Sequence, residues 1–296
     1  MYRRFDLKGI DMSDKLFTKT KTLSFEVFPP KKDGEFDAAF EIMDALGELS
    51  PDFISVTYGA GGSRAGKSVE IASYIQNKLN IDAVMHMTCV GNKSAELLAI
   101  AEELKKHSVS HILALRGDRP KDMTDEQYHS REFAHANEMI AFLKGHTELH
   151  IAAACYPEKH FESFSMESDL KNLKAKQDAG AEYLISQLFF DNDYYYSFLE
   201  RADKKGISIP ISAGIMPITS AKQLGTTVTL AGSSIPKALA DLFATYGDDP
   251  AEMRKAGIDY AIRQIRDLQE NGVSHIHIYT MNKPLIAKEI CEAIYR

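Results

Sequence analysis

The chain has 296 residues, 44% of them hydrophobic and 26% charged, a balance typical of a folded protein with a sizeable core rather than a disordered one. The net charge is −7 and the basic residues are scattered, which argues against a nucleic-acid surface and favours small-molecule partners. Three distant cysteines form no metal-ligand spacing, and no segment is long and apolar enough to span a bilayer. We therefore expect a cytoplasmic protein.

Apolar runs of strand length recur along the chain after an N-terminal extension. They cover residues 22–28, 53–59, 83–89, 111–118, 150–157, 183–190, 207–215 and 275–282. The segments between them, such as 67–80, 94–108 and 166–180, repeat apolar residues every three or four positions, which predicts helices with one buried face. An extra helical segment, 234–247, precedes the last helix–strand unit.

This alternation predicts an α/β protein with a parallel sheet, and eight units at about 35 residues each favour a closed (β/α)8 TIM barrel. A doubly wound dinucleotide-binding sheet is the alternative. It expects G-x-G-x-x-G after a strand, but Arg64 replaces the third glycine in the candidate stretch at 58–66. No linker or low-complexity segment divides the chain, so we expect one catalytic domain over residues 1–296.

Polar residues stand at the C-terminal end of nearly every predicted strand, where barrel active sites lie. They are Glu26, Thr57, Tyr58, His86, Thr88, Arg116, Asp118, Tyr156, Glu158, His160, Gln187, Tyr279 and Asn282. Each alone fits a structural role, such as a core histidine or an ion pair. Together they predict a site for a polar ligand and for proton transfer. A metal site is disfavoured because no H-E-x-x-H pairing occurs.

Glu26 stands out because it lies inside the apolar run SFEVFPP, residues 24–30. Burial of an ionised carboxylate without partners costs several kcal/mol, so this position calls for a function. The residues by themselves indicate a barrel enzyme with an acid–base site and go no further.

Eight motifs in order carry a resemblance to a known family: SFEVFPPK, FISVTYGAGGSR, MHMTCVG, HILALRGDRP, AACYPEKH, DLKNLKAKQDAGAEYLISQLFFD, GIMPI and HIYTMNK. Over nearly the whole chain they resemble the catalytic domain of bacterial 5,10-methylenetetrahydrofolate reductases. The resemblance implies a (β/α)8 barrel that holds FAD at its mouth, with NADH or NADPH as the reductant and 5-methyltetrahydrofolate, a methyl source for methionine synthesis, as the product. It also implies a homo-oligomer, which in this family is often a tetramer.

The resemblance assigns roles to individual residues. Glu26 becomes the general acid that helps protonate N10 of the folate, and its apolar surroundings raise its pKa as that role requires. Asp118, in the turn Arg116-Gly117-Asp118, lies beside the flavin and tunes its potential. The expected FAD-lining residues also include Thr57, Tyr58, Ala60, His86, Ala134, Tyr156, His160, Asp169, Asn172 and Lys176. The expected substrate-binding residues are Gln187, Gln223 and Lys283.

Three positions depart from the family pattern: Lys283 replaces an arginine, Ala175 a basic residue, and Thr227 an aromatic residue that would stack on the substrates. Two alternatives remain open. One is a flavin-free barrel lyase or transferase that uses Glu26 and His86 as acid and base, and the other is a catalytically silent folate-binding protein.

Overall fold

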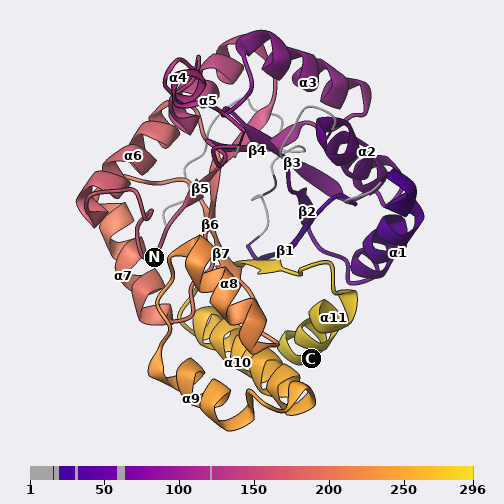
Figure 1. Cartoon of the computed structure of the whole chain (residues 1–296), viewed down its shortest axis with the longest axis vertical. Coiled ribbons are helices and arrows are strands. Elements are labelled where there is room, and N and C mark those ends of the chain that lie inside the picture. Colours follow the sequence, from indigo (N-terminus) through magenta and orange to yellow (C-terminus); the bar gives the residue numbers. More distant parts are fainter. Residues whose placement is uncertain (1–15, 17–19, 31–32, 59–63, 121, 296) are drawn as a thin grey trace.

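The structure is a computed structural model, and it describes residues 16, 20–30, 33–58, 64–120 and 122–295. Eight parallel strands pair in the order β1 to β8 and close into a barrel, with β8 paired to β1 (Figure 1). The strands are β1 Thr22–Val27, β2 Phe53–Val56, β3 Asp82–Thr88, β4 His111–Leu115, β5 His150–Cys155, β6 Tyr183–Ser186, β7 Ile211–Ile215 and β8 His275–Tyr279. The predicted TIM barrel is confirmed.

Helices surround the barrel on its outer side (Figure 1). They are α1 Phe36–Gly47, α2 Arg64–Asn77, α3 Ser94–Lys106, α4 Asp125–His129, α5 Ala136–His146, α6 Met166–Asp178, α7 Asn192–Lys204, α8 Ala221–Ala231, α9 Lys237–Tyr246, α10 Pro250–Glu270 and α11 Pro284–Ile294, with a short 3₁₀ turn, η2, at Asp33–Glu35. The extra helix predicted at 234–247 is α9, and the short α4 was not predicted.

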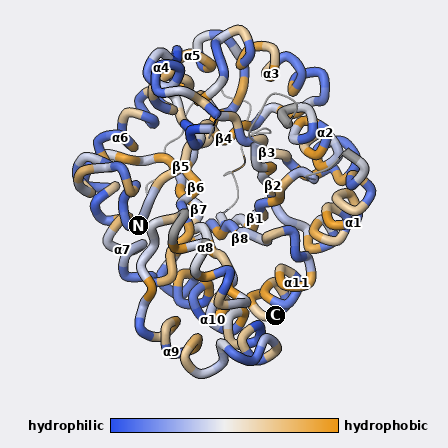
Figure 2. Tube along the Cα trace, in the orientation of Figure 1, coloured by the Kyte–Doolittle hydropathy of each residue, from blue (hydrophilic) through white to orange (hydrophobic). Residues whose placement is uncertain are grey.

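Strand alternation gives the barrel two separate apolar layers. Leu23, Phe25 and Val27 of β1 face outward and belong to the large core between strands and helices. The interior holds a smaller cluster that consists of Leu16, Phe53, Val84, Leu113, Ala152, Tyr183 and Ile185. Hydrophilic residues gather on the outer helices and loops (Figure 2). Side chains thus fill the barrel, and ligands have access only at its ends.

Most predicted strands run too long at their C-terminal ends. For example, 53–59 shrinks to β2 Phe53–Val56 and 111–118 to β4 His111–Leu115. The polar residues that follow leave the strand ladder and form the rim of the barrel. The predicted N-terminal extension lies mostly outside the described residues. No described helix is long and apolar enough to cross a membrane.

Candidate active site

Glu26 and His86 meet at the mouth of the barrel. Oε2 of Glu26 lies 3.5 Å from Nε2 of His86, and the two side chains are 15% and 8% exposed. Burial raises the pKa of Glu26 to about 8 and lowers that of His86 to about 3. Both groups are therefore neutral at pH 7, with the carboxyl proton on Glu26. The geometry suits a general acid held in its protonated form.

The backbone on either side of Glu26 is fixed from β8 and the loop that follows it. The Thr280 hydroxyl donates to the carbonyl of Glu26 at 2.7 Å. Asn282 both accepts from the amide and donates to the carbonyl of Phe28, each at 3.0 Å. Asn282, which the sequence placed at the mouth, thus clamps the end of β1. Tyr279, opposite Glu26 in the strand register, donates to the carbonyl of Ser186 at 2.7 Å.

The turn after β4 brings a glycine against β3. Gly117 has φ +83°, and a Cβ there would lie 2.9 Å from Cβ of Thr88, so only glycine fits without a shift of the backbone. Arg116 forms a bidentate ion pair with Glu162, and its Nη2 is 3.0 Å from Oε1. Asp118 follows at the rim and is exposed. The turn therefore has an exposed carboxylate at the rim, while its arginine is tied to the loop between β5 and α6.

The loop between β5 and α6 is held by its own polar groups. Asp169 accepts from the His160 amide at 3.1 Å and from the Ser163 hydroxyl at 2.8 Å. The His160 ring meets Tyr156 edge-on at 4.7 Å. Lys176 donates to the Ala154 carbonyl at 2.8 Å, and burial lowers its pKa. These four predicted residues, Tyr156, His160, Asp169 and Lys176, lie together on one side of the mouth.

The other predicted residues are placed less uniformly. Thr57 and Tyr58 follow β2 at the rim, and Tyr58 Oη accepts from Asn92 at 3.4 Å. Ala134 lies in the loop before α5, where its carbonyl accepts from Arg131 at 3.0 Å. Asn172 is exposed on α6, whereas Lys176, four residues later on the same helix, turns inward. The two side chains therefore differ in their exposure to solvent. Ala60 lies outside the described residues.

The three predicted substrate residues are Gln187, Gln223 and Lys283. Oε1 of Gln187 accepts from the Leu188 amide at 2.9 Å at the end of β6. Gln223 is hydrogen-bonded within its own turn, to the Thr219 amide at 3.0 Å and to the Pro217 carbonyl at 3.1 Å. Lys283 is exposed at the start of α11. Gln187 directly follows β6, whereas Gln223 lies in the first turn of α8 and Lys283 at the N-terminus of α11.

Sequence reasoning missed two residues of the mouth. Met216, directly after β7, contacts Thr227, whose Oγ1 lies 3.5 Å from Met216 Sδ, and Thr227 is only 8% exposed. His277 is fully buried beneath Tyr279, and its ring lies 5.2 Å from the tyrosine ring. Period-two alternation from Tyr279 was the signal that could have placed His277 inside the barrel.

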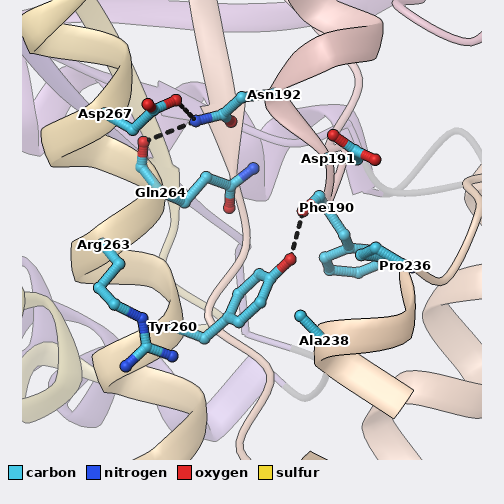
Figure 3. Close-up of a pocket in the computed structure, with 9 residues that line it drawn as sticks. All are labelled: Phe190, Asp191, Asn192, Pro236, Ala238, Tyr260, Arg263, Gln264 and Asp267. Atoms are coloured by element: carbon cyan, nitrogen blue, oxygen red, sulfur yellow. Dashed lines mark hydrogen bonds between the residues drawn. The ribbon is translucent and has the colours of Figure 1, made fainter. Parts of the chain in front are cut away.

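A second hollow lies outside the barrel, between the start of α7, α9 and α10 (Figure 3). Its volume is 320 Å³. Its polar groups already join these elements: Tyr260 donates to the Phe190 carbonyl at 2.6 Å, and Asn192 donates to Gln264 and Asp267. These contacts tie α10 to the turn after β6, and the groove holds none of the predicted site residues.

The fold and its mouth define a barrel enzyme with a buried acid at the end of β1. Residues 11–295 match the family model described as "Methylenetetrahydrofolate reductase". The chain is 33% identical to the 5,10-methylenetetrahydrofolate reductase of Escherichia coli K12, over 92% of this chain and 90% of that protein. It is 35% identical to the enzyme of Buchnera aphidicola from Schizaphis graminum, over 90% of each chain. The chain belongs to the methylenetetrahydrofolate reductase family.

A solved structure supports the fold independently. It is that of an uncharacterized protein from Clostridium thermocellum that binds two copies of 5-methyl-5,6,7,8-tetrahydrofolic acid. The TM-score is 0.63 at 14% sequence identity, over 93% of this chain and 94% of that one. The likeness concerns the barrel.

Proposed function

We propose that the protein reduces 5,10-methylenetetrahydrofolate to 5-methyltetrahydrofolate, with FAD as cofactor and NADH or NADPH as electron donor. The observation that carries the proposal is a buried carboxyl, Glu26, at the mouth of a barrel of this family, where burial raises its pKa to about 8. When bound, FAD would accept a hydride from the pyridine nucleotide and pass it to the folate methylene carbon. The two substrates would use one site in turn, in ping-pong order.

Glu26 performs the proton-transfer part of this reaction. Its O–H breaks as an N–H forms on N10 of the folate, which opens the five-membered ring to a cation that accepts hydride. Because burial disfavours the carboxylate, Glu26 holds its proton at neutral pH, and His86 next to it is neutral. Its side chain is only 15% exposed, which limits the access of water to the reacting atoms.

The residues present fit a flavin dinucleotide. The left-handed Gly117 lets the backbone come close to a flat ring, with Asp118 next to it. Lys176 and His160 provide a positive charge and a ring on the neighbouring side, which suit a phosphate and a ribose. The proposed FAD-binding residues also include Thr57, Tyr58, His86, Ala134, Tyr156, Asp169 and Asn172. The proposed substrate-binding residues are Gln187, Gln223 and Lys283.

One experiment tests cofactor, donor and substrate together. Purified protein is reduced anaerobically with NADH or NADPH while flavin absorbance is followed, and methylenetetrahydrofolate is then added. We expect bleaching by the nucleotide and return of the colour with the folate. A colourless protein would instead favour the flavin-free lyase or transferase that uses Glu26 and His86, and a protein that binds folate but is not bleached would favour a silent binder.

A further inference from the structure

One line of the barrel interior, the seam where β1 pairs with β8, is polar. The register places Thr22 opposite His275 and Ser24 opposite His277. Thr22 Oγ1 lies 2.8 Å from Nδ1 of His275, and Ser24 Oγ lies 2.7 Å from Nδ1 of His277. Two hydroxyl–imidazole pairs therefore follow each other along the seam, about 6.6 Å apart by strand geometry. Glu26 is the next inward-facing residue of β1.

The seam connects the two ends of the barrel. His275 lies at the N-terminal end of β8 and is partly exposed, whereas Ser24 and His277 are fully buried. The interior beside them combines apolar side chains, such as Phe53, whose ring stacks on that of His277 at 5.9 Å, with the buried hydroxyls of Ser55 and Ser212. A buried line of polar pairs needs an explanation, because buried polar groups cost free energy unless they are hydrogen-bonded.

Two buried imidazole nitrogens, one in the seam and one beside Glu26, can form hydrogen bonds that the described side chains do not supply. Nε2 of His86 and Nε2 of His277 are buried and have no hydrogen-bond partner in the described part of the chain. Such atoms in native proteins are usually satisfied by ordered water. The two rings are close enough that His86 contributes to the lowered pKa of His277. Water between them would connect the seam to Glu26.

Ser24 gives the upper pair the freedom to pass a proton. Its hydroxyl has two acceptors within reach, Nδ1 of His277 at 2.7 Å and the carbonyl of Ile276 at 3.2 Å. When the hydroxyl donates to Nδ1, the imidazole proton is on Nε2. When it turns to Ile276, Nδ1 can carry the proton and donate to the serine oxygen. The ring can therefore receive a proton on one nitrogen and release one from the other.

We propose that the Thr22–His275 and Ser24–His277 pairs, with His86 and with water that bridges the gaps between them, form a proton path from the N-terminal end of the barrel to Glu26. The inference rests on the proposed function, because that reaction consumes the proton of Glu26. The Glu26 carboxylate left behind takes a proton from the path, and the path takes a proton from solvent at His275. One solvent proton therefore enters per turnover, and no redox change occurs. The path operates while ligands cover the mouth.

The groups that face the seam are consistent with this direction. Asp52, at the N-terminal end, accepts from the Leu23 amide at 2.8 Å, and its charge opposes the effect of burial on the pKa of His275. At the other end stand Glu26, His86 and the Tyr279 hydroxyl, and Tyr279 donates to a carbonyl away from the seam. Glu26 is thus the group at the mouth that accepts the proton.

A matched pair of variants tests the path kinetically. Ser24→Ala removes the seam hydroxyl, and Ser233→Ala removes a buried hydroxyl in the loop before α9, which donates to the Leu188 carbonyl and lies off the seam. Reoxidation of pre-reduced enzyme in a single turnover should be unchanged in both, because Glu26 starts protonated. Steady-state turnover of Ser24→Ala alone should fall several-fold, with a larger solvent deuterium isotope effect, yet by less than the roughly 10²-fold or more expected on loss of the acid itself.

Thr22→Val, which keeps the side-chain shape, provides a second break at the lower pair in case Ser24→Ala fails to fold. Normal turnover in whichever of these two variants folds would overturn the path. An equal loss in single-turnover reoxidation would also overturn it, because that result would mean that the seam only positions Glu26.

The path also has a test that needs neither flavin nor folate. In ¹⁵N-histidine-labelled apoprotein at pH 7, both nitrogens of neutral His277 should show shifts between those of the two pure tautomers. Ser24→Ala should fix one tautomer, and Ser233→Ala should resemble the wild type. A single tautomer in the wild type that Ser24→Ala leaves unchanged would refute the path. If the histidine shifts behave as expected while the flavin assay fails, the reductase assignment is wrong and the proposed proton path still stands.

Discussion

Nε2 of His86 lies 3.5 Å from Oε2 of Glu26, and burial drives the two groups toward the neutral state from opposite directions. A buried ion pair at this place would require the desolvation of two charges, whereas the neutral pair leaves the proton on the carboxyl. The relationship explains how a glutamate serves as an acid at neutral pH, and five predictions besides the seam experiments follow from the mouth that surrounds it.

Replacement of Glu26 by Gln should separate the two half-reactions. The variant should hold flavin and accept hydride from the pyridine nucleotide at the normal rate, because that step needs no proton on folate N10. Folate reduction should fall by roughly 10² to 10⁴. Stopped-flow absorbance of each half-reaction measures this, with Glu41→Gln, an exposed acid on α1, as the control. Equal losses in both halves would contradict the assignment.

The raised pKa of Glu26 predicts that activity and stability both decline as the pH rises. Folate reduction should fall as the pH rises through about 8, where Glu26 loses its proton. Between the ordinary carboxyl value of 4.5 and about 8 the folded state binds more protons than the unfolded state, so this group's contribution to stability declines as the pH rises across that window.

The stability of Glu26→Gln should therefore lack this decline. Urea unfolding at several pH values between 5 and 8 measures the difference, and the wild type should lose stability relative to the variant as the pH rises. His86 and His277 act at the acidic side: their lowered pKa values cost stability as the pH falls from 6.5 toward about 3 in both proteins. Parallel curves for the two proteins between pH 5 and 8 would mean that Glu26 titrates normally.

Asp118→Asn should shift the flavin potential upward, because it removes a negative charge beside the ring in the proposed complex. Reduction by the nucleotide should become easier and hydride delivery to folate slower. Spectroelectrochemistry of the flavin measures the shift. Asp122→Asn, at an exposed position in the same loop, is the matched control. An unchanged or lower potential in Asp118→Asn would place the carboxylate away from the flavin.

Gly117→Ala should destabilise the protein, because its Cβ would meet Thr88 at 2.9 Å and φ is +83°. We expect a loss of more than about 1 kcal/mol together with weaker flavin retention. Gly145→Ala, in α5 with nothing near its Cβ, should instead gain about 0.5–1 kcal/mol. Chemical denaturation gives both values. A neutral Gly117→Ala would mean that the turn adapts without cost.

The family aromatic that Thr227 replaces suggests a test of the space beside Met216. Thr227 is buried against Met216, so Thr227→Phe should cost about 1–3 kcal/mol through overpacking. In a Met216→Ala background, Thr227→Phe should cause a smaller loss of stability. If the introduced phenylalanine ring enters the mouth, KM for folate or nucleotide should fall several-fold. A double-mutant cycle without coupling would show that the two side chains do not share this space.

The barrel and its rim could be predicted from the pattern of residues along the chain. Eight β-branched runs with amphipathic helices between them require a parallel sheet, because each helix must return the chain to the same end, and eight such units close. The position of Glu26 within an apolar run already implied a raised pKa, because burial of a strand is a local property of its pattern. Local sequence patterns therefore predict secondary structure and the burial of a strand, because both depend on residues that are close in the sequence.

The contacts between distant side chains could not be predicted in this way, because they depend on the packing of the folded barrel. The pairing of Glu26 with His86 depends on the lateral register of β1, β2 and β3, and the Ser24–His277 contact joins residues 253 positions apart. Met216 against Thr227 and the inward turn of Lys176 depend on packing at the rim, where loops do not repeat. Barrel closure brings β8 beside β1, and that long-range contact creates a polar seam that no local pattern contains.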